Sequence, residues 1–127
     1  MNEQSIRRCL EHIGQALSAA DPHGIADCWA LPALVLSDEG AIVLTEAGQI
    51  ESFFTRAIEG YRSQGLTATR PQLERVEPLS EKLTSVDVRW PTFDATGAEK
   101  ASERSHYILQ LGEDGQQRIQ VALTRTR

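Results

Sequence analysis

Residues 45–65 read TEAGQIESFFTRAIEGYRSQG, and this stretch decides how the rest of the sequence can pack. Its apolar positions follow the spacing i, i+3, i+4, i+7, i+8 and i+11, which predicts a helix with one apolar face. These positions are Ile50, Phe53, Phe54, Ala57, Ile58 and Tyr61. Thr45 is the predicted N-terminal cap, and Gly65 is the predicted C-terminal stop. Because each large buried side chain contributes roughly 1.5 to 3 kcal/mol, we expect this helix to be the main packing element.

The sequence that follows the helix has no helical periodicity and alternates extended segments with turn clusters. We predict strands near 67–77, 82–93, 99–112 and 116–125, with hairpin turns at Asp94–Gly97 and Gly112–Gly115. Three sets of residues would each share an apolar strand face: Val86, Val88 and Trp90; Tyr107, Leu109 and Leu111; and Ile119, Val121 and Leu123. The opposite faces carry polar residues. This alternation predicts an antiparallel sheet that is covered on one side.

Two helices and a hairpin are predicted before the central helix. Apolar residues at steps of three and four predict an amphipathic helix over residues 3–20. Asp21 followed by Pro22 predicts a second helix that continues to about Ala30, because Asp caps free N–H groups and Pro has none to leave unpaired. The turn residues Ser37–Gly40 separate two apolar runs and predict a hairpin. The two runs are Ala33–Leu36 and Ala41–Leu44.

Composition and charge indicate a globular protein and argue against several classes of partner. The chain has 127 residues, with 40% hydrophobic and 24% charged side chains, which predicts one globular domain over residues 1–127. The net charge of -5 argues against nucleic acid and anionic membranes as partners. The first residues lack the apolar run of a secretory signal, so we expect a cytoplasmic protein. Cys9 and Cys28 lack metal-site spacing, and we expect neither a disulfide, a metal nor another cofactor.

Three stretches and the order of the predicted elements resemble a known superfamily. The stretches are ADCWALPALVLSDEG at 26–40, VRWPTFDATG at 88–97 and YILQLGEDGQQRIQ at 107–120. In these features the whole chain resembles the nuclear transport factor 2-like superfamily, which includes ketosteroid-isomerase-like and polyketide-cyclase-like proteins. The resemblance implies a cystatin-like α+β fold. In this fold a curved, mostly antiparallel sheet forms a cone-shaped roll, packs on the N-terminal helices and wraps the central helix.

The resemblance also implies a pocket at the open end of the cone and a homodimer formed through the sheet. The inward ends of the helices and the inward faces of the strands would line such a pocket. The predicted lining residues are Trp29, Phe54, Tyr61, Trp90, Glu103, Ser105 and Tyr107. Most of these side chains are apolar or aromatic, which favours a small hydrophobic ligand held by few polar groups.

Glu103 and Tyr107 are the predicted catalytic residues if the pocket is an active site. They share strand parity with Ser105 between them, so all three side chains are expected to face one cavity. A carboxylate that moves a proton and a hydroxyl that stabilises an enolate oxygen are the groups used by the ketosteroid isomerases that the chain resembles. The ketosteroid isomerases also pair their base with a tyrosine on a helix, and Tyr61 is the candidate for that role here. The sequence offers no second inward acid.

Asp87 and His106 replace Val88 and Tyr107 as pocket residues if the strand register is shifted by one residue. In the favoured register both lie on the polar face. Asp87 with Arg89 also resembles part of the Asp-Arg-Asp arrangement of limonene epoxide hydrolases, but an exposed ion pair or a dimer contact is the expected use of these two residues.

Three functions remain open from the sequence. The first is a small-molecule-binding domain with an aromatic-lined pocket. The second is a cofactor-independent isomerase, cyclase or dehydratase that moves a proton on a small hydrophobic substrate. The third is a noncatalytic accessory or protein-interaction module. Many activities share this type of fold, so the fold alone does not choose between them.

Overall fold

The computed structural model describes residues 3–125, in which two helices and a β-hairpin precede a third helix and a series of strands follows it. The helices are α1 (Glu3–Ser18), α2 (Pro22–Ala26) and α3 (Ala47–Ser63). The strands are β1 (Trp29–Ser37), β2 (Gly40–Leu44), β3 (Leu66–Thr69), β4 (Gln72–Pro78), β5 (Leu83–Asp94), β6 (Glu99–Leu111) and β7 (Gln117–Arg125). The predicted α+β order is therefore confirmed.

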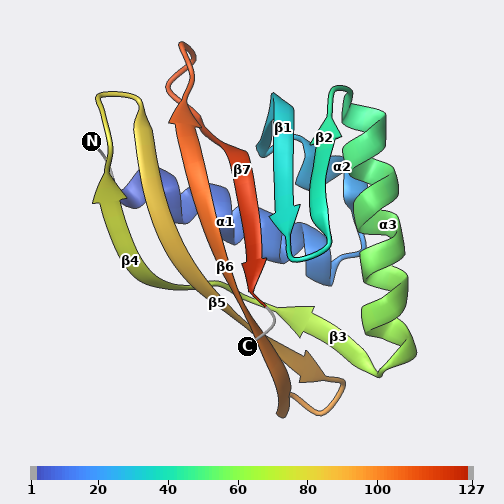
Figure 1. Cartoon of the computed structure of the whole chain (residues 1–127). Helices are drawn as coiled ribbons and strands as arrows, with labels where there is room; N and C mark the ends of the chain where they lie inside the picture. The colour runs from blue at the N-terminus through green and yellow to red at the C-terminus, as the bar shows by residue number, and fades with distance from the viewer. Residues whose placement is uncertain (1–2, 126–127) are drawn as a thin grey trace.

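The strands form one curved sheet with the order β2-β1-β7-β6-β5-β3, and β4 also pairs with β5. Its pairs are antiparallel except for the parallel pair of β1 with β7, so the sheet is mixed. Figure 1 shows α1 crossing behind the sheet and α3 standing beside the β1–β2 hairpin. The sheet does not close, because β2 and β3 remain at opposite ends of the order. The molecule is an open, cystatin-like roll.

The face of the sheet that is turned toward the helices carries the core. Val86, Val88 and Leu109 are fully buried there, and so are Ile6 and Leu10 of α1. Burial of such side chains is the dominant favourable term in folding. The strand parity predicted for β5 and β6 is confirmed, and the alternative register is wrong, because Val88 and Tyr107 point inward while Asp87 pairs with His106 outside.

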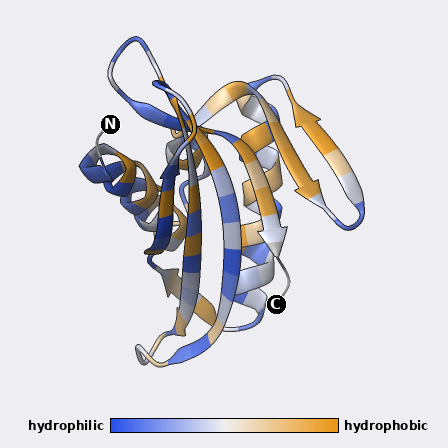
Figure 2. Cartoon of the chain, turned by 60° about the vertical axis from the view of Figure 1, so that its left-hand side comes forward, coloured by the Kyte–Doolittle hydropathy of each residue, from blue (hydrophilic) through white to orange (hydrophobic). Residues whose placement is uncertain are grey.

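The outer face of the sheet divides into an apolar half and a polar half. Two rows of aligned residues cross the strands. From β2 to β4, one row is Val43, Leu34, Val121, Ile108, Ser85 and Glu77, and the other is Ala41, Leu36, Leu123, His106, Asp87 and Arg75. Figure 2 shows the hydrophobic colour concentrated in the β1–β2 hairpin and alternating bands along the other strands. The apolar half therefore lies on β1, β2 and β7.

The central helix forms as predicted, but most of its apolar face is not sealed in the core. Ile50 and Ile58 are buried, whereas Phe53, Phe54, Ala57 and Tyr61 are only half-buried. The expectation that this helix is the main packing element is therefore wrong, because part of its apolar face lines open space.

The helix cap is shifted by one residue from the prediction. The N-cap is Glu46 rather than Thr45. The side-chain oxygen of Gln49 accepts hydrogen bonds from the backbone N–H groups of Thr45 and Glu46, at 2.7 and 3.0 Å, and from the Thr45 hydroxyl at 3.1 Å. These bonds satisfy donors that the helix itself leaves free. Gly65, which has a φ of +79°, follows the C-cap as predicted.

The second helix is shorter than predicted, because the last residues of the predicted helix pair with a strand of the sheet instead. It ends at Ala26, and the prediction that it reaches Ala30 is wrong. The carbonyl of Cys28 accepts a hydrogen bond of 2.8 Å from the N–H of Ile119, and Trp29 then pairs with β7. Trp29 therefore enters the structure on a strand rather than on a helix.

The strand predicted over residues 67–77 is split into β3 and β4. Both pieces pair with β5, one with each end of it. The break falls at Arg70 and Pro71, where Pro71 has no N–H to contribute to a ladder. The Ser18 hydroxyl at the end of α1 instead contacts the backbone of Thr69, accepting from its N–H at 3.0 Å. The hydrogen bonds between Ser18 and Thr69 therefore join the end of α1 to β3.

A register shift in β7 reverses the parity predicted for its second half. Leu109 pairs with Ile119 but Ile108 pairs with Val121, which leaves Gln120 as an extra residue. Val121 and Leu123 consequently turn to the outer face, and Ala122 and Thr124 face the interior. The prediction that Ile119, Val121 and Leu123 share one face is wrong for this reason.

We predict that Gln49→Ala lowers the free energy of unfolding by about 1 kcal/mol, because two backbone donors at the start of α3 lose their acceptor. Urea denaturation monitored by circular dichroism measures this change. Gln15→Ala, at an exposed position of α1, is the control and should leave the midpoint nearly unchanged. An unaltered midpoint for Gln49→Ala would contradict the capping role.

Candidate functional site

A cavity of about 220 Å³ lies between the inner face of the sheet, α3 and the C-terminal half of α1. Its position explains why the apolar face of α3 is only half-buried. All seven residues predicted to line a pocket are found around it: Trp29, Phe54, Tyr61, Trp90, Glu103, Ser105 and Tyr107. The structure thus brings together side chains from α3, β1, β5 and β6.

Residues that the prediction did not include complete the lining. They are Ile13, Leu17, Val35, Phe53, Ala57, Thr69, Thr92, Ile119, Ala122 and Thr124. Phe53 and Ala57 belong to the apolar stripe of α3, and Thr92 shares parity with Trp90, so these three carried a sequence signal. Ala122 and Thr124 had no such signal in the sequence, since only the register shift in β7 turns them inward.

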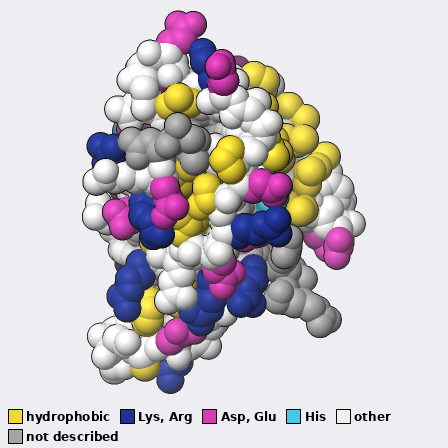
Figure 3. Space-filling model, turned by 90° about the vertical axis from the view of Figure 1, so that its left-hand side faces the viewer, with side chains coloured by type: hydrophobic (Ala, Val, Ile, Leu, Met, Phe, Trp, Pro, Cys, Tyr) yellow, Lys and Arg dark blue, Asp and Glu magenta, His cyan; other side chains and the backbone are white. Residues whose placement is uncertain are grey.

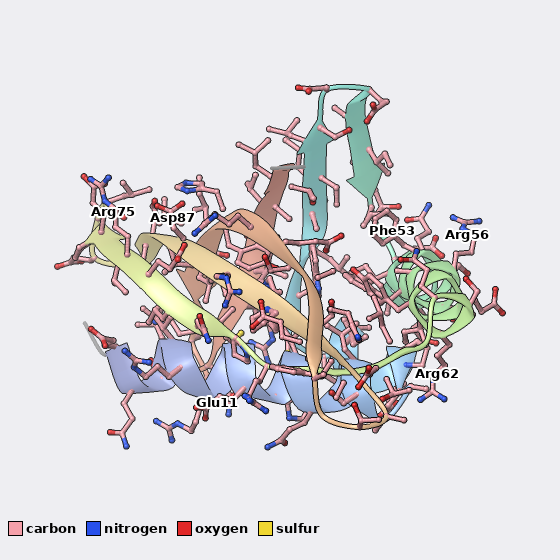
Figure 4. All side chains as sticks on the ribbon, turned by 90° about the horizontal axis from the view of Figure 1, so that it is seen from below. Glu11, Phe53, Arg56, Arg62, Arg75 and Asp87 are labelled. Atoms are coloured by element: carbon pink, nitrogen blue, oxygen red, sulfur yellow. The ribbon has the colours of Figure 1, made fainter. Side chains whose placement is uncertain are left out.

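Three aromatic rings form one wall of the cavity. The ring centroids of Trp29 and Phe54 are 5.8 Å apart, and those of Phe53 and Phe54 are 5.2 Å apart in an edge-on arrangement. Such tilted contacts are favourable for aromatic pairs. Figure 4 shows Phe53 on the side of α3 that faces the sheet and Arg56 on the side turned away. The wall is therefore apolar and held by packing between α3 and β1.

Polar groups gather on the opposite side of the cavity. The Tyr61 hydroxyl on α3 donates a hydrogen bond of 3.0 Å to the Glu103 carboxylate on β6. Burial raises the pKa of Tyr61 well above its usual range, and the negative charge of Glu103 adds to this effect. Glu103 itself is exposed. Tyr61 is thus a neutral donor at physiological pH, and Glu103 lies where the cavity meets solvent.

A second hydrogen-bonded pair lies deeper. The Trp90 indole N–H donates a bond of 2.9 Å to the hydroxyl oxygen of Tyr107, and both side chains are buried. Burial raises the pKa of Tyr107 to about 12, although hydrogen bonds from Ser105 and Trp90 oppose the shift. Tyr107 therefore stays protonated at physiological pH and presents a neutral hydroxyl to the cavity.

Asp87 and His106 lie on the opposite face of the sheet from the cavity. His106 Nδ1 is 2.7 Å from the Asp87 carboxylate, and its Nε2 is 3.1 Å from the Ser85 hydroxyl. Arg89 bonds to Gln72 and to Glu99. In Figure 4, Arg75 and Asp87 project from the side of the sheet that is turned away from α1. Neither Asp87 nor His106 is therefore part of the cavity.

No group of three or more His, Cys, Asp or Glu side chains within residues 3–125 is placed to hold a metal ion. Among the helices of the same segment, none is both long and apolar enough to cross a membrane.

Solved structures with this fold come from several bacteria. A domain of unknown function with a cystatin-like fold from Nostoc punctiforme has a TM-score of 0.78 and 18% identity, over 98% of this chain and 76% of that one. An NTF-2 like protein of unknown function from Shewanella oneidensis has a TM-score of 0.77 and 12% identity, over 98% of both chains. A ketosteroid isomerase-like protein from Erwinia carotovora atroseptica has a TM-score of 0.70 and 14% identity, over 98% of this chain and 96% of that one.

At these identities the similarity concerns the fold alone. No curated protein matches the chain. The model of one protein family, described as NTF2-like protein (DUF6841), matches residues 2–127. That match spans the helices, the curved sheet and the cavity, and it agrees with the resemblance found in the sequence. The chain therefore belongs to the NTF2-like protein family DUF6841.

Proposed function

We propose that the cavity binds a small, mostly apolar molecule that carries one polar group. The observation behind this proposal is the arrangement of the lining, with aromatic rings on one side and the hydroxyls of Tyr61 and Tyr107 beside Glu103 on the other. Apolar walls with a few convergent polar groups are typical of small-molecule sites. At about 220 Å³ the cavity is smaller than the roughly 300 to 1,000 Å³ of sites for drug-sized ligands. A ligand of one or two rings fits this size.

Proton transfer is the second candidate function, and the pairing of a carboxylate with two phenols favours it. In such a reaction Glu103 takes a proton from carbon while Tyr107 donates a hydrogen bond to the developing oxyanion. One of the structural relatives is a ketosteroid isomerase-like protein, which is consistent with this chemistry.

Two features of the site make binding the better-supported function. Glu103 is exposed to solvent and its carboxylate already accepts a hydrogen bond from Tyr61, so it is neither shielded from water nor free of other partners. Tyr107, with a pKa near 12, is a weaker acid than an ordinary tyrosine. A binding site needs neither an effective base nor an acidic hydroxyl. An accessory module with a filled pocket is the least supported alternative, since the cavity has room for several water molecules.

We also propose that two copies of the chain pair through the apolar half of the outer sheet face. Val43 is 59% exposed, and it lies in the row that contains Leu34 and Val121. Figure 3 shows acidic and basic side chains interspersed over the side of the molecule nearest β4, with hydrophobic side chains gathered toward the β1–β2 hairpin. A contiguous apolar patch with a charged border is typical of an interface. The cytoplasmic location, the single domain and the lack of a cofactor remain predictions.

Filling the cavity should remove ligand binding. We predict that Ala57→Phe weakens the binding of 2-naphthol, a two-ring alcohol, by about ten-fold or more, because the new ring occupies the space beside Phe54. Quenching of tryptophan fluorescence measures the affinity, since Trp29 and Trp90 both line the cavity. Ser52→Phe, on an exposed position of the same helix, should bind as tightly as the wild type. Equal affinities for all three proteins would argue that the probe binds elsewhere.

Substitution of the Glu103 carboxylate distinguishes ligand binding from proton transfer. We predict that Glu103→Gln changes 2-naphthol affinity by less than about three-fold, since an amide also accepts a hydrogen bond from Tyr61. We further predict that the wild type does not accelerate deuterium exchange next to the carbonyl of 2-cyclohexenone, followed by proton NMR. Acceleration that disappears in Glu103→Gln would instead establish the proton-transfer function.

A charge on the apolar half of the outer face should break the proposed dimer. We predict that Val121→Lys is monomeric in sedimentation velocity and keeps its cavity, because the side chain points away from it. Glu77→Lys, on the polar half of the same row, is the control and should remain dimeric. A monomeric wild type at micromolar concentration would refute the dimer.

A further inference from the structure

The two cysteines come together in a groove that shares no lining residue with the cavity. The groove is formed by one face of α1, the junction between α2 and β1, and the turn between β6 and β7. Cys9 contributes from α1, Cys28 from the α2–β1 junction and Arg118 from β7. Residues from three separate parts of the sequence therefore surround the two thiols.

The two cysteines are neighbours in the wall of this groove. Both residues are free cysteines that are buried but not fully sealed, at 8% and 7% exposure. The Cys28 thiol also donates a hydrogen bond of 3.8 Å to the carbonyl of Gly24. The backbone holds Cys28 in place, because its carbonyl accepts from the N–H of Ile119. Because both side chains line one groove and each perturbs the pKa of the other, the two thiols are placed near each other, as a disulfide requires.

The surroundings favour different protonation states for the two thiols. The hydrogen bond from Cys9 lowers the pKa of Cys28, whereas burial and the negative charge of Asp27 oppose this effect. The positive charge of Arg118 adds a smaller lowering of the pKa. The hydrogen bond to Cys28, followed by burial, raises the pKa of Cys9 far above its usual range. Cys28 is therefore the more acidic of the two thiols.

Arg118 is itself held in place. Its guanidinium group forms bonds of 3.2 and 2.8 Å with the two carboxylate oxygens of Asp114 in the β6–β7 turn. A fixed cation beside a thiol pair is the arrangement that increases thiolate content in reactive cysteines.

We propose that Cys9 and Cys28 form an oxidation-sensitive dithiol that hydrogen peroxide converts into an intramolecular disulfide. The Cys28 thiolate attacks one peroxide oxygen, so an S–O bond forms, the O–O bond breaks and water leaves after the departing hydroxide gains a proton. The Cys9 sulfur then attacks the Cys28 sulfenic acid. An S–S bond forms, the S–O bond breaks, and the Cys9 proton leaves with the hydroxide as a second water. Peroxide is the oxidant, and the dithiol is oxidised by two electrons.

The disulfide would join α1 to the residue that precedes β1 and would close a loop of the chain between them. It would do so next to Trp29, which follows Cys28 and lines the cavity. The proposal does not depend on ligand binding, because the groove and the cavity have no residue in common.

The test is to treat the reduced, full-length protein with a small excess of hydrogen peroxide and follow the intact mass. The wild type should lose two hydrogen atoms without gaining oxygen, and peptide mapping should recover the Cys9 and Cys28 peptides joined. Cys9→Ser should stop at a sulfenic acid on Cys28, which dimedone traps. Cys28→Ser should not react at a comparable rate. Retention of both free thiols in the wild type, or a disulfide only between chains, would overturn the proposal.

A charge variant tests the mechanism without altering either thiol. Arg118→Met should slow disulfide formation by about three-fold or more, because the thiolate loses its cation. Arg7→Met is the matched control, since Arg7 pairs with Glu3 on α1 and lies outside the groove. Circular dichroism should show that both variants are folded. Equal rates for the two variants would show that Arg118 does not activate Cys28.

Discussion

The antiparallel pairing of β5 with β6 is the constraint on which the rest of the structure depends. It runs from Leu83 opposite Gln110 to Phe93 opposite Glu99. Because side chains alternate along a strand, this one register sends Trp90 and Tyr107 inward. It also places Asp87 against His106 on the outside. A shift by one residue would exchange the aromatic pair of the cavity for the hydrogen-bonded pair of Asp87 and His106.

The same register explains why the cavity has two chemically different sides. Its polar groups come mainly from β6, where Glu103, Ser105 and Tyr107 follow one another at every second position. Its aromatic wall comes from α3 and β1, which are held at a distance from β6 by the curvature of the sheet. The helix cannot fill the space, so Phe54 and Tyr61 face an opening instead of a sealed core. The arrangement suits recognition of an amphipathic small molecule more than it suits strong acid or base catalysis.

Local patterns predicted most of this fold. The stripe on α3, the turns after β5 and β6, and the parity of those two strands were all visible, because each depends on neighbouring residues. That parity also predicted which side chains of these two strands line the cavity, namely Trp90, Glu103, Ser105 and Tyr107. The role of those side chains remains a proposal, since neither parity nor fold specifies a ligand.

The features that were mispredicted depend on contacts between distant segments. Helix α2 ends early because Cys28 pairs with Ile119, which lies far along the chain. The extra residue Gln120 in β7 has no signature of its own, yet it turns Val121 outward and Ala122 inward. The proximity of Cys9 and Cys28 is likewise invisible in a sequence whose cysteines show no recognisable spacing. In each case tertiary structure decides between conformations that the local sequence permits equally.

The most direct test of the central claim is a crystal structure determined under xenon pressure, because xenon enters apolar cavities and scatters strongly. The account predicts a xenon atom inside the roll, between Phe54 and Tyr107, with the Trp90–Tyr107 hydrogen bond intact. A roll whose interior is filled by its own side chains, with no xenon bound there, would contradict it.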